Sequence, residues 1–484
     1  MSNLRRTVPV EQGVDPAAVL GFVDAVDADP DVELHSLMVL RHGCVVAEGW
    51  WAPYTPERAR LVYSLSKSVT STALAIAVGE GLVGLEDTAI SHFQEFAAEI
   101  TDERSRSITV RDLASMAAGH DHDMWPEAVT NDPEEPVRGF LLLPPDASPG
   151  SVFAYSQPCT YTLAAIIQRR TGMRLTDYLR PRLLDPLGIG EVSWQCRPAG
   201  RELGFSGLFA TTEDMARLGQ LYLQRGRWGD RQLVPESYVA EATSRQVPTR
   251  QMENVDWQQG YGYQFWMSRH GFRGDGAFGQ LCLVLSELDS VVAMTGGTEA
   301  VQSVLSHVWE HLLPGLGVTG PDDQRRVAVT QEELDWRLRD LSLVPVGGTP
   351  SPSTWEDWVS APFLVTSGPE PTEGSHLTSV TLATTDHGLE IGVEETGNSL
   401  TFGAGSGRWD VSEPSDIHGL PVPVAASAAW TDDHTLEIDV AFLETPHRLA
   451  IVCSLPARTA QTAWQVAPLD GGRLNTLRRP RRHP

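Results

Sequence analysis

The sequence predicts an α/β (α+β) domain followed by a smaller all-β domain. The chain has 484 residues, which is more than one hydrophobic core usually supports. Its longer N-terminal part mixes helical and strand patterns, whereas its C-terminal part alternates apolar and polar residues with a period of two, as half-buried strands do. A Pro/Gly/Ser-rich stretch, PVGGTPSPS, lies between the two parts and predicts a linker.

The composition is that of a folded and strongly acidic protein. Hydrophobic residues make up 41% of the chain and charged residues 21%, as in ordinary globular domains. The formal net charge of −26 repels phosphate backbones and anionic headgroups, so we expect neither nucleic acid nor a membrane as a partner. No apolar run suits a signal peptide or a spanning helix, and the five scattered cysteines fit reduced thiols. These features predict a cytoplasmic protein.

The N-terminal part begins with a helix and a pair of strands. An amphipathic pattern over residues 17–25 predicts the helix, and the run ELHSLMVLRHGCVVAEGWW predicts two strands joined at His42 and Gly43. From Ser64 to Gly81 apolar residues recur at helical spacing, which predicts a largely buried helix. Further helices are expected over Tyr161–Thr171, Thr212–Arg225 and Thr298–Leu313, and glycine-led strands over Gly276–Ala293.

The C-terminal part follows a helix predicted over QEELDWRLRDLSL. Beyond the linker, Leu389, Ile391 and Val393 alternate with polar residues, and the run from Leu436 to Phe442 repeats the pattern. A short run of arginines at the end of the chain is typical of a disordered tail. We therefore assign an α/β domain to residues 1–328, a helix and linker to 329–354, an all-β domain to 355–470 and a basic disordered tail to 471–484.

A Ser-x-x-Lys motif, formed by Ser64 and Lys67, stands at the start of the first long helix. Residues three apart share one face of a helix, so the lysine amine can meet the serine hydroxyl. A serine becomes nucleophilic when a base takes its proton, and a lysine can be that base when burial lowers its pKa. The N–H of Ser64, at the positive end of the helix, can stabilise the oxyanion that forms on attack. Capped helices also show this spacing by chance, so further motifs are needed.

Two later segments supply the further motifs. In PGSVFAYSQ, Tyr155 lies in a loop before a helix, and a tyrosine held against a lysine ammonium can have a lowered pKa and act as general base. A tyrosine that only packs is the alternative. In RGDGAFGQ, residues 273–280, the glycines permit close backbone approach to a ligand, and an edge strand there could present a second oxyanion donor. A tight turn is the alternative for this segment.

Two other groups of residues have a functional and a structural interpretation. The run His120-Asp121-His122-Asp123 contains types of residue that bind metals, but residues two apart serve one metal only on a strand-like backbone. We therefore favour a polar loop that borders the site and expect no metal. Aromatic residues in loops, among them Trp125 and Trp266, either line a pocket for an apolar acyl group or belong to the core.

Taken together, SLSK at 64–67, YSQ at 155–157 and GDGAFGQ at 274–280 resemble the three ordered motifs of the penicillin-binding protein and class C β-lactamase superfamily of serine hydrolases. The resemblance implies an antiparallel sheet flanked by helices plus a helical lobe, with the site between them. The C-terminal domain resembles the lipocalin-like extension of some members, which implies a small β-barrel.

The resemblance also implies roles for individual residues. Ser64 is expected to form the acyl-enzyme, and Lys67 and Tyr155 to transfer protons. The amides of Ser64 and of the region around Ala277 and Phe278 are expected to form the oxyanion hole. For substrate contacts we name, beyond these, Gln157, Asp275, Gly276, Trp125 and Trp266.

Two positions depart from the family pattern. Gln157 replaces the asparagine that commonly ends the second motif and is longer by one methylene. Asp275 replaces the lysine that β-lactamases place in the third motif, or the histidine or tryptophan of related esterases and peptidases. Because a carboxylate repels the carboxylate of a penicillin, weak or no β-lactamase activity is expected.

The sequence therefore predicts a hydrolase that cleaves a small ester, an amide such as a D-amino-acid amide, or a β-lactam-like compound through an acyl-Ser64 intermediate. The substrate is a small molecule, and no cofactor is required. A biosynthetic acyltransferase or peptide cyclase with the same acyl-enzyme remains an alternative, as does a non-catalytic acyl-binding protein. Homo-oligomer formation is left open.

Overall fold

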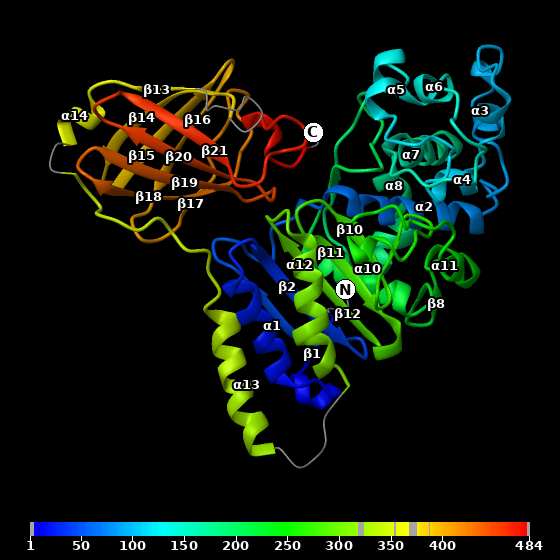
Figure 1. Cartoon of the computed structure of the whole chain (residues 1–484), viewed down its shortest axis with the longest axis horizontal. Helices are drawn as coiled ribbons and strands as arrows, with labels where there is room; N and C mark the ends of the chain where they lie inside the picture. The colour runs from blue at the N-terminus through cyan, green and yellow to red at the C-terminus, as the bar shows by residue number, and fades with distance from the viewer. Residues whose placement is uncertain (1–3, 318–323, 353–354, 367–374, 387, 482–484) are drawn as a thin grey trace.

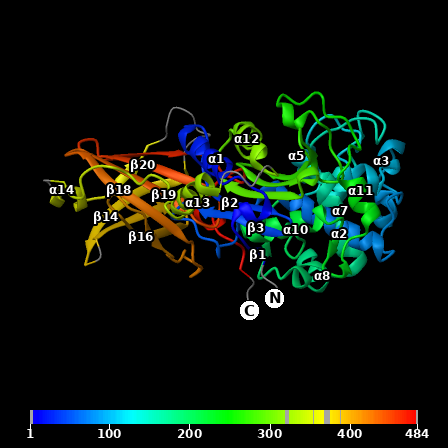
Figure 2. The same ribbon diagram turned by 90° about the horizontal axis from the view of Figure 1, so that it is seen from below.

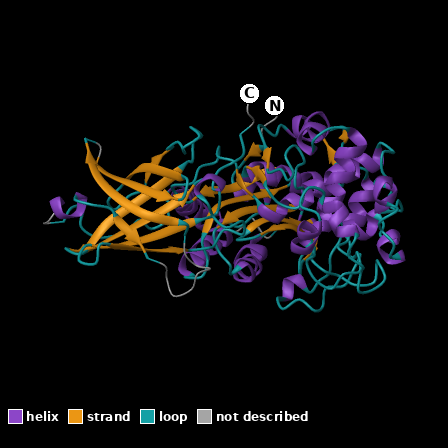
Figure 3. Ribbon diagram, turned by 90° about the horizontal axis from the view of Figure 1, so that it is seen from above, coloured by secondary structure: helices purple, strands orange, loops and turns teal. Residues whose placement is uncertain are grey.

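The computed structural model describes residues 4–317, 324–352, 355–366, 375–386 and 388–481, which form two domains (Figure 1). The large domain combines a central sheet, helices on both of its faces and a helical lobe. The barrel and the helical lobe lie at opposite ends of the molecule in the view from below (Figure 2). Strands dominate one end and helices the other (Figure 3). The predicted α/β (α+β) domain followed by an all-β barrel-like domain is confirmed.

The central sheet has seven strands in the order β1-β3-β2-β12-β11-β10-β9. Neighbouring strands pair antiparallel, as expected, except β1, which pairs parallel with β3 and makes the sheet mixed. The strand β1 pairs through two residues only, and a strand of this length is too short to be recognised from a period-two pattern in the sequence. The strands are β1 (Arg5–Arg6), β2 (Leu34–Arg41), β3 (Cys44–Trp50), β9 (Trp266–Met267), β10 (Phe272–Gly276), β11 (Gln280–Leu285) and β12 (Ser290–Gly296).

Helices cover both faces of this sheet, and β2 shows how. Successive side chains of a strand point to opposite faces. Leu37 and Val39 pack in a core with α1 (Pro16–Ala28), whereas Met38 and Leu40 pack in the core that contains α10 (Thr212–Leu223). Figure 1 shows α12 (Val301–His307) and α13 (Gln324–Arg339) beside α1. The hairpin and the helices expected from the sequence are thus present.

The helical lobe is built around α2 and α7 and includes several shorter helices. The helix predicted from Ser64 is α2, which begins at Ser66 after the 3₁₀ turn η2 (Tyr63–Leu65). The other helices of the large domain are α3 (Glu103–Ser107), α4 (Val110–Ala114), α5 (Trp125–Asn131), α6 (Pro136–Leu141), α7 (Gln157–Thr171), α8 (Leu175–Leu179), α9 (Asp185–Leu187) and α11 (Glu236–Ala242). Short strands β4 (Arg60–Leu61), β5 (Ser193–Trp194) and β6 (Leu208–Ala210) form a small sheet, and β7 (Arg227–Trp228) pairs with β8 (Arg231–Gln232).

The C-terminal domain is a nearly closed barrel of nine strands in the order β16-β15-β14-β13-β21-β20-β19-β18-β17. A bridge between Gly405 and Ser427 brings the two ends of the sheet together. The predicted alternation is confirmed, since Ile391 and Val393 of β15 belong to the barrel core. The elements are α14 (Trp355–Val359), β13 (Phe363–Val365), β14 (Leu377–Thr385), β15 (Gly388–Glu395), β16 (Asn398–Ala404), β17 (Asp410–Ser412), β18 (Val424–Asp432), β19 (Thr435–Phe442), β20 (Arg448–Ser454) and β21 (Thr459–Trp464).

The segment predicted to be a disordered tail makes specific contacts through residue 481. Arg478 pairs with Asp416 at 3.2 Å, and the Asp416 side chain is fully buried. Arg479 pairs with Glu444 at 3.1 Å. Disorder was predicted from the run of arginines alone. The acidic residues that pair with these arginines lie elsewhere in the barrel sequence, so composition could not reveal the contacts.

Within the described ranges, no helix combines the length and the apolar character needed to cross a bilayer. The five cysteines, all within these ranges, are free thiols.

Candidate active site

Ser64 lies in η2, between the short strand β4 and α2. Tyr63, directly before it, has a φ of 46°, in the left-handed region that few residues other than glycine adopt. Ser66 stabilises this turn, because its hydroxyl donates to the carbonyl oxygen of Tyr63 at 2.5 Å and accepts from the N–H of Leu208 at 3.1 Å. Ser64 itself remains partly exposed, so a substrate can reach its hydroxyl.

Lys67 lies one helical turn beyond Ser64 and is buried. Its Nζ contacts Ser64 Oγ at 3.0 Å, Gln157 Oε1 at 2.6 Å and the carbonyl oxygen of Phe205 at 2.9 Å. Burial lowers the pKa of Lys67 to about 7, while the negative charges of Asp123 and Asp275 oppose this change. A lysine with this pKa has a substantial neutral fraction near pH 7, which a general base requires.

Tyr155 approaches the same serine from the loop before α7. Its phenol lies close enough to the Ser64 hydroxyl for that group to influence its pKa, and Lys67 Nζ lies 4.7 Å from the centroid of its ring. Burial raises the pKa of Tyr155 well above its usual value, and the nearby Ser64 hydroxyl offsets this rise only in part. The expected lowering of this pKa is therefore wrong, because the lysine lies over the ring face and burial dominates. Tyr155 is protonated at neutral pH.

The third motif forms β10, whose glycines lie against η2 and α2. A Cβ on Gly276 would be 2.2 Å from the carbonyl oxygen of Val62, and a Cβ on Gly274 would be 3.0 Å from Ser68 Oγ. The strand β9 pairs only with Phe272 and Arg273, so the glycine-containing half of β10 extends beyond it. The tight turn expected for this motif follows Gly276, whose close approach is to the backbone at Val62. The approach of this segment to a ligand stays a prediction.

That turn contains Ala277 and Phe278, the residues expected to complete the oxyanion hole. Phe278 has a φ of 65°, and its ring packs edge-on against Tyr63 with centroids 5.3 Å apart. Ala277 packs on the same cluster. The turn thus lies beside η2, and the donation of its amides to an oxyanion stays a prediction.

Asp275 has a partner that sequence analysis missed. Arg273, two residues earlier on β10 and fully buried, donates from Nε to Asp275 Oδ2 at 2.8 Å. Burial raises the pKa of Asp275, and the Arg273 charge opposes that rise. The Arg273 guanidinium also lies 4.4 Å from the ring centroid of Trp257. Asp275 is therefore one half of a buried ion pair. Its side chain is 11% exposed.

The aromatic residues surround the catalytic candidates on two sides. Trp266 is buried and stacks on Tyr155 with centroids 5.5 Å apart. Trp125 packs against Phe205 at 4.7 Å, and Phe205 in turn supplies the carbonyl that Lys67 contacts. Trp266 thus contacts a catalytic candidate directly, whereas Trp125 does so through Phe205.

The loop that contains His120 to Asp123 borders the site, as expected. Asp123 Oδ1 accepts from the N–H of Gln157 at 2.8 Å and so connects this loop to the second motif. His122 points outward and pairs with Asp121. Among the described residues, no three His, Cys, Asp or Glu side chains gather in a way that could hold a metal ion. Asp123 is thus a residue that fixes the site, a role that its local sequence did not reveal.

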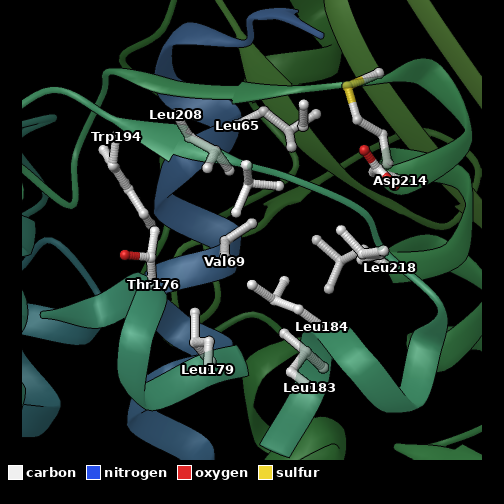
Figure 4. Close-up of a pocket in the computed structure, with 14 residues that line it drawn as sticks. Leu65, Val69, Thr176, Leu179, Leu183, Leu184, Trp194, Leu208, Asp214 and Leu218 are labelled. Atoms are coloured by element: carbon white, nitrogen blue, oxygen red, sulfur yellow. The ribbon is translucent and has the colours of Figure 1, made fainter. Parts of the chain in front are cut away.

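A separate apolar pocket lies on another face of α2 (Figure 4). Leu65 and Val69 contribute to its wall, together with Leu179, Leu183 and Leu218 from later helices. Leu65 and Val69 lie one and five residues after Ser64, so their side chains point away from the helix face that Ser64 and Lys67 share. The pocket therefore does not include the catalytic candidates.

Comparisons with known proteins bear on the family and the fold. The β-lactamase family model matches residues 22–300. The 6-aminohexanoate-dimer hydrolase of Paenarthrobacter ureafaciens is 26% identical over 278 residues, which cover 53% of this chain and 71% of that protein. A Bacillus anthracis structure named as a 6-aminohexanoate-dimer hydrolase aligns with a TM-score of 0.50 and 19% identity, over 70% of this chain and 87% of the other. A Bacteroides dorei DSM 17855 structure named as a β-lactamase aligns with a TM-score of 0.50 and 15% identity, over 62% of this chain and 99% of the other. At these identities the two structures support the fold alone.

Proposed function

Because the chain belongs to the β-lactamase family, we propose that it is a serine hydrolase that cleaves an ester or amide through an acyl-Ser64 intermediate. The observation that carries this proposal is the 3.0 Å contact between Lys67 Nζ and Ser64 Oγ, made by a lysine whose pKa burial lowers to about 7. A hydroxyl beside an amine that is partly neutral at pH 7 is an activated nucleophile.

The first half of the reaction is acylation. Ser64 Oγ attacks the substrate carbonyl carbon while its proton passes to neutral Lys67 Nζ, and a C–O bond forms. The tetrahedral intermediate then collapses, and the bond to the leaving group breaks. Tyr155, which is protonated and lies beside Ser64, is the proposed proton donor to the leaving group. The proton that Lys67 took from Ser64 then passes to the Tyr155 phenolate, which leaves Lys67 neutral, the tyrosine hydroxyl restored and the acyl group on Ser64.

The second half repeats these transfers with water. A water molecule attacks the acyl carbonyl carbon and gives one proton to Lys67. The bond between the acyl carbon and Ser64 Oγ then breaks, Lys67 returns the proton to Ser64 Oγ, and the acid leaves. In both halves, negative charge develops on the carbonyl oxygen. The amides of Ser64, Ala277 and Phe278 are the proposed donors to it, because the turn after β10 lies beside η2.

The proposed substrate is a small neutral ester or amide. The relative from Paenarthrobacter ureafaciens is named for hydrolysis of an amino-acid dimer, which favours a small amide among the candidates. Gln157 accepts from Lys67 through Oε1, which leaves its Nε2 available to donate to a substrate carbonyl oxygen. Asp275 can accept from a substrate N–H at its exposed edge.

Intact-mass spectrometry after treatment with a fluorophosphonate tests the nucleophile. The wild-type chain should gain one adduct, and Ser64→Ala should gain none. Ser151→Ala is the matched control, because Ser151 is an exposed serine whose hydroxyl bonds only to the carbonyl oxygen of Ser148. An unlabelled wild type, or full labelling of Ser64→Ala, contradicts the proposal.

Turnover of p-nitrophenyl butyrate separates hydrolysis from its alternatives. Sustained release of p-nitrophenol, with butyrate as the product, is expected of a hydrolase. A single burst without turnover indicates an acyl-binding protein. If an added amine takes most of the butyryl group, the chain is an acyltransferase.

A further inference from the structure

The segment that leads into the nucleophile is held by both domains. On one side β4 pairs with β6 of the large domain, and the N–H of Val62 donates to the carbonyl oxygen of Leu208 at 2.9 Å. On the other side the N–H of Leu61 donates to the carbonyl oxygen of Glu444, in the turn after β19 of the barrel, at 2.9 Å. Residues that directly precede Ser64 thus depend on the barrel for a backbone hydrogen bond.

A second contact between the domains is made by the side chain next to Ser64. The hydroxyl of Tyr63 lies 2.6 Å from Nε2 of His447, a buried residue between β19 and β20. The Nδ1 of His447 lies 2.9 Å from the carbonyl oxygen of Val466. Because a carbonyl oxygen only accepts, Nδ1 holds the ring proton and Nε2 accepts from the Tyr63 O–H. Burial lowers the pKa of His447 to about 4, so the ring keeps this neutral form at neutral pH.

The same histidine also contacts the third motif. The rings of His447 and Phe278 pack edge-on with centroids 5.4 Å apart, and each ring also packs against Tyr63. Tyr63 and Phe278 both have positive φ, in the left-handed region that is unfavourable for such residues. Conformations of this kind persist where the surrounding structure enforces them. Here one barrel histidine packs against both residues.

These two residues flank the reacting atoms. Tyr63 fixes the direction in which the chain enters Ser64, and Phe278 lies in the turn whose amides are the proposed oxyanion donors. A displacement of either by a fraction of an ångström would move the nucleophile relative to the oxyanion site.

We propose that the C-terminal barrel completes the catalytic site of the large domain, with His447 as a positioning residue that holds Tyr63 and the Phe278 turn in place. This inference rests on the proposed function, since it assigns His447 a role in the acylation of Ser64. His447 does not touch the reacting atoms. It acts through the hydrogen bond to Tyr63.

The test compares variants that remove this hydrogen bond and keep the packing. His447→Phe retains an aromatic ring and lacks the acceptor, whereas Tyr63→Phe removes the donor from the other domain. Ser379→Ala is the control, because it removes one hydrogen bond, to Glu394 Oε2 at 2.9 Å, within strands of the same barrel. The measurements are the rate of fluorophosphonate labelling, kcat and KM for p-nitrophenyl butyrate, and Tm.

We expect both phenylalanine variants to lower the labelling rate and kcat roughly 10- to 100-fold, with little change in KM. The double variant should be no slower than the slower single variant, because both remove one bond. Ser379→Ala should label at the wild-type rate. His447→Gln, which can still accept from the Tyr63 O–H, should recover part of the loss.

Each outcome of this test has a distinct meaning. If His447→Phe and Tyr63→Phe fold and label at the wild-type rate, the positioning role is refuted while the hydrolase proposal stands. If their effects multiply in the double variant, the hydrogen bond is not the link. If His447→Phe does not fold, Tyr63→Phe decides the question. If the wild type itself is not labelled, the proposed function fails, and the role of His447 in acylation fails with it.

Discussion

The rate of acylation should rise with pH around a midpoint near 7, because Lys67 must be neutral to accept the proton of Ser64. Its pKa is lowered to about 7 from the usual 10.5 by burial, which disfavours the charged ammonium. The lowered pKa of Lys67 sets the direction of the pH dependence of acylation. Activity is lost as pH falls below 7, when Lys67 becomes protonated, and levels off above roughly pH 8.

The size of the effect separates this lysine from an ordinary one. At pH 7 roughly half of the Lys67 side chains are neutral if the pKa is about 7, whereas a pKa of 10.5 leaves roughly one in 3000 neutral. A buried lysine therefore supplies the base form about a thousand times more often. An ordinary lysine would instead give a rate that rises tenfold for each pH unit through pH 9.

Fluorophosphonate labelling of the folded chain between about pH 5.5 and about pH 9.5 measures this profile. Asp123→Asn provides a second readout, because the negative charge of Asp123 favours the Lys67 ammonium, and its asparagine oxygen can still accept from the N–H of Gln157. This variant should move the midpoint to lower pH. A rate that is flat across the range, or one that still rises tenfold per unit above pH 8, would refute the assignment of Lys67 as the base.

Three further substitutions test other parts of the site. Tyr155→Phe removes the hydroxyl beside Ser64 and keeps the ring that stacks on Trp266. We expect kcat to fall about 10²- to 10⁴-fold with KM little changed, and wild-type kcat would exclude Tyr155 from proton transfer. Gly276→Ala places a Cβ 2.2 Å from the carbonyl oxygen of Val62. Urea unfolding should therefore show a free energy of unfolding lower by about 1 to 3 kcal/mol, and fluorophosphonate labelling should be slower. If stability and labelling are unchanged, β10 can move away from η2. Asp275→Asn leaves the fully buried guanidinium of Arg273 without its counter-charge and should lower the free energy of unfolding by about 3 to 5 kcal/mol. Adding Arg273→Met should recover part of this loss. If Asp275→Asn is as stable as the wild type, the ion pair contributes little to stability.

Local patterns were sufficient to predict the elements that bring the chemistry together. Helical spacing identified α2, and the i, i+3 relation placed Ser64 beside Lys67 without any tertiary information. The period of two identified the barrel strands, because each has one buried face. Tyr155 and β10 were assigned by the order of the motifs, which the structure brings to one place.

The features that were missed depend on contacts between distant segments. Asp123 matters because its carboxylate accepts from the N–H of Gln157, and no local pattern shows that contact. The direction of the Tyr155 pKa was wrong because burial outweighs the nearby lysine, and burial is a property of the folded chain. His447 lies more than 380 residues from Tyr63, so its role is visible only once the barrel is placed against the large domain.

The pairing of Asp275 with Arg273 changes the electrostatic reason for the expected substrate. As a free anion, Asp275 would repel the carboxylate of a penicillin. In the structure Arg273 holds it at 2.8 Å, so the two charges largely cancel at the site. The guanidinium is itself fully buried and cannot serve an anionic substrate as the lysine of a β-lactamase would. Lys67 adds only part of a positive charge near pH 7, because its pKa is about 7. We therefore still expect a neutral ester or amide as the substrate. The reason is that the third motif lacks an accessible cation to bind an anionic substrate, and not that an unpaired Asp275 carboxylate repels one.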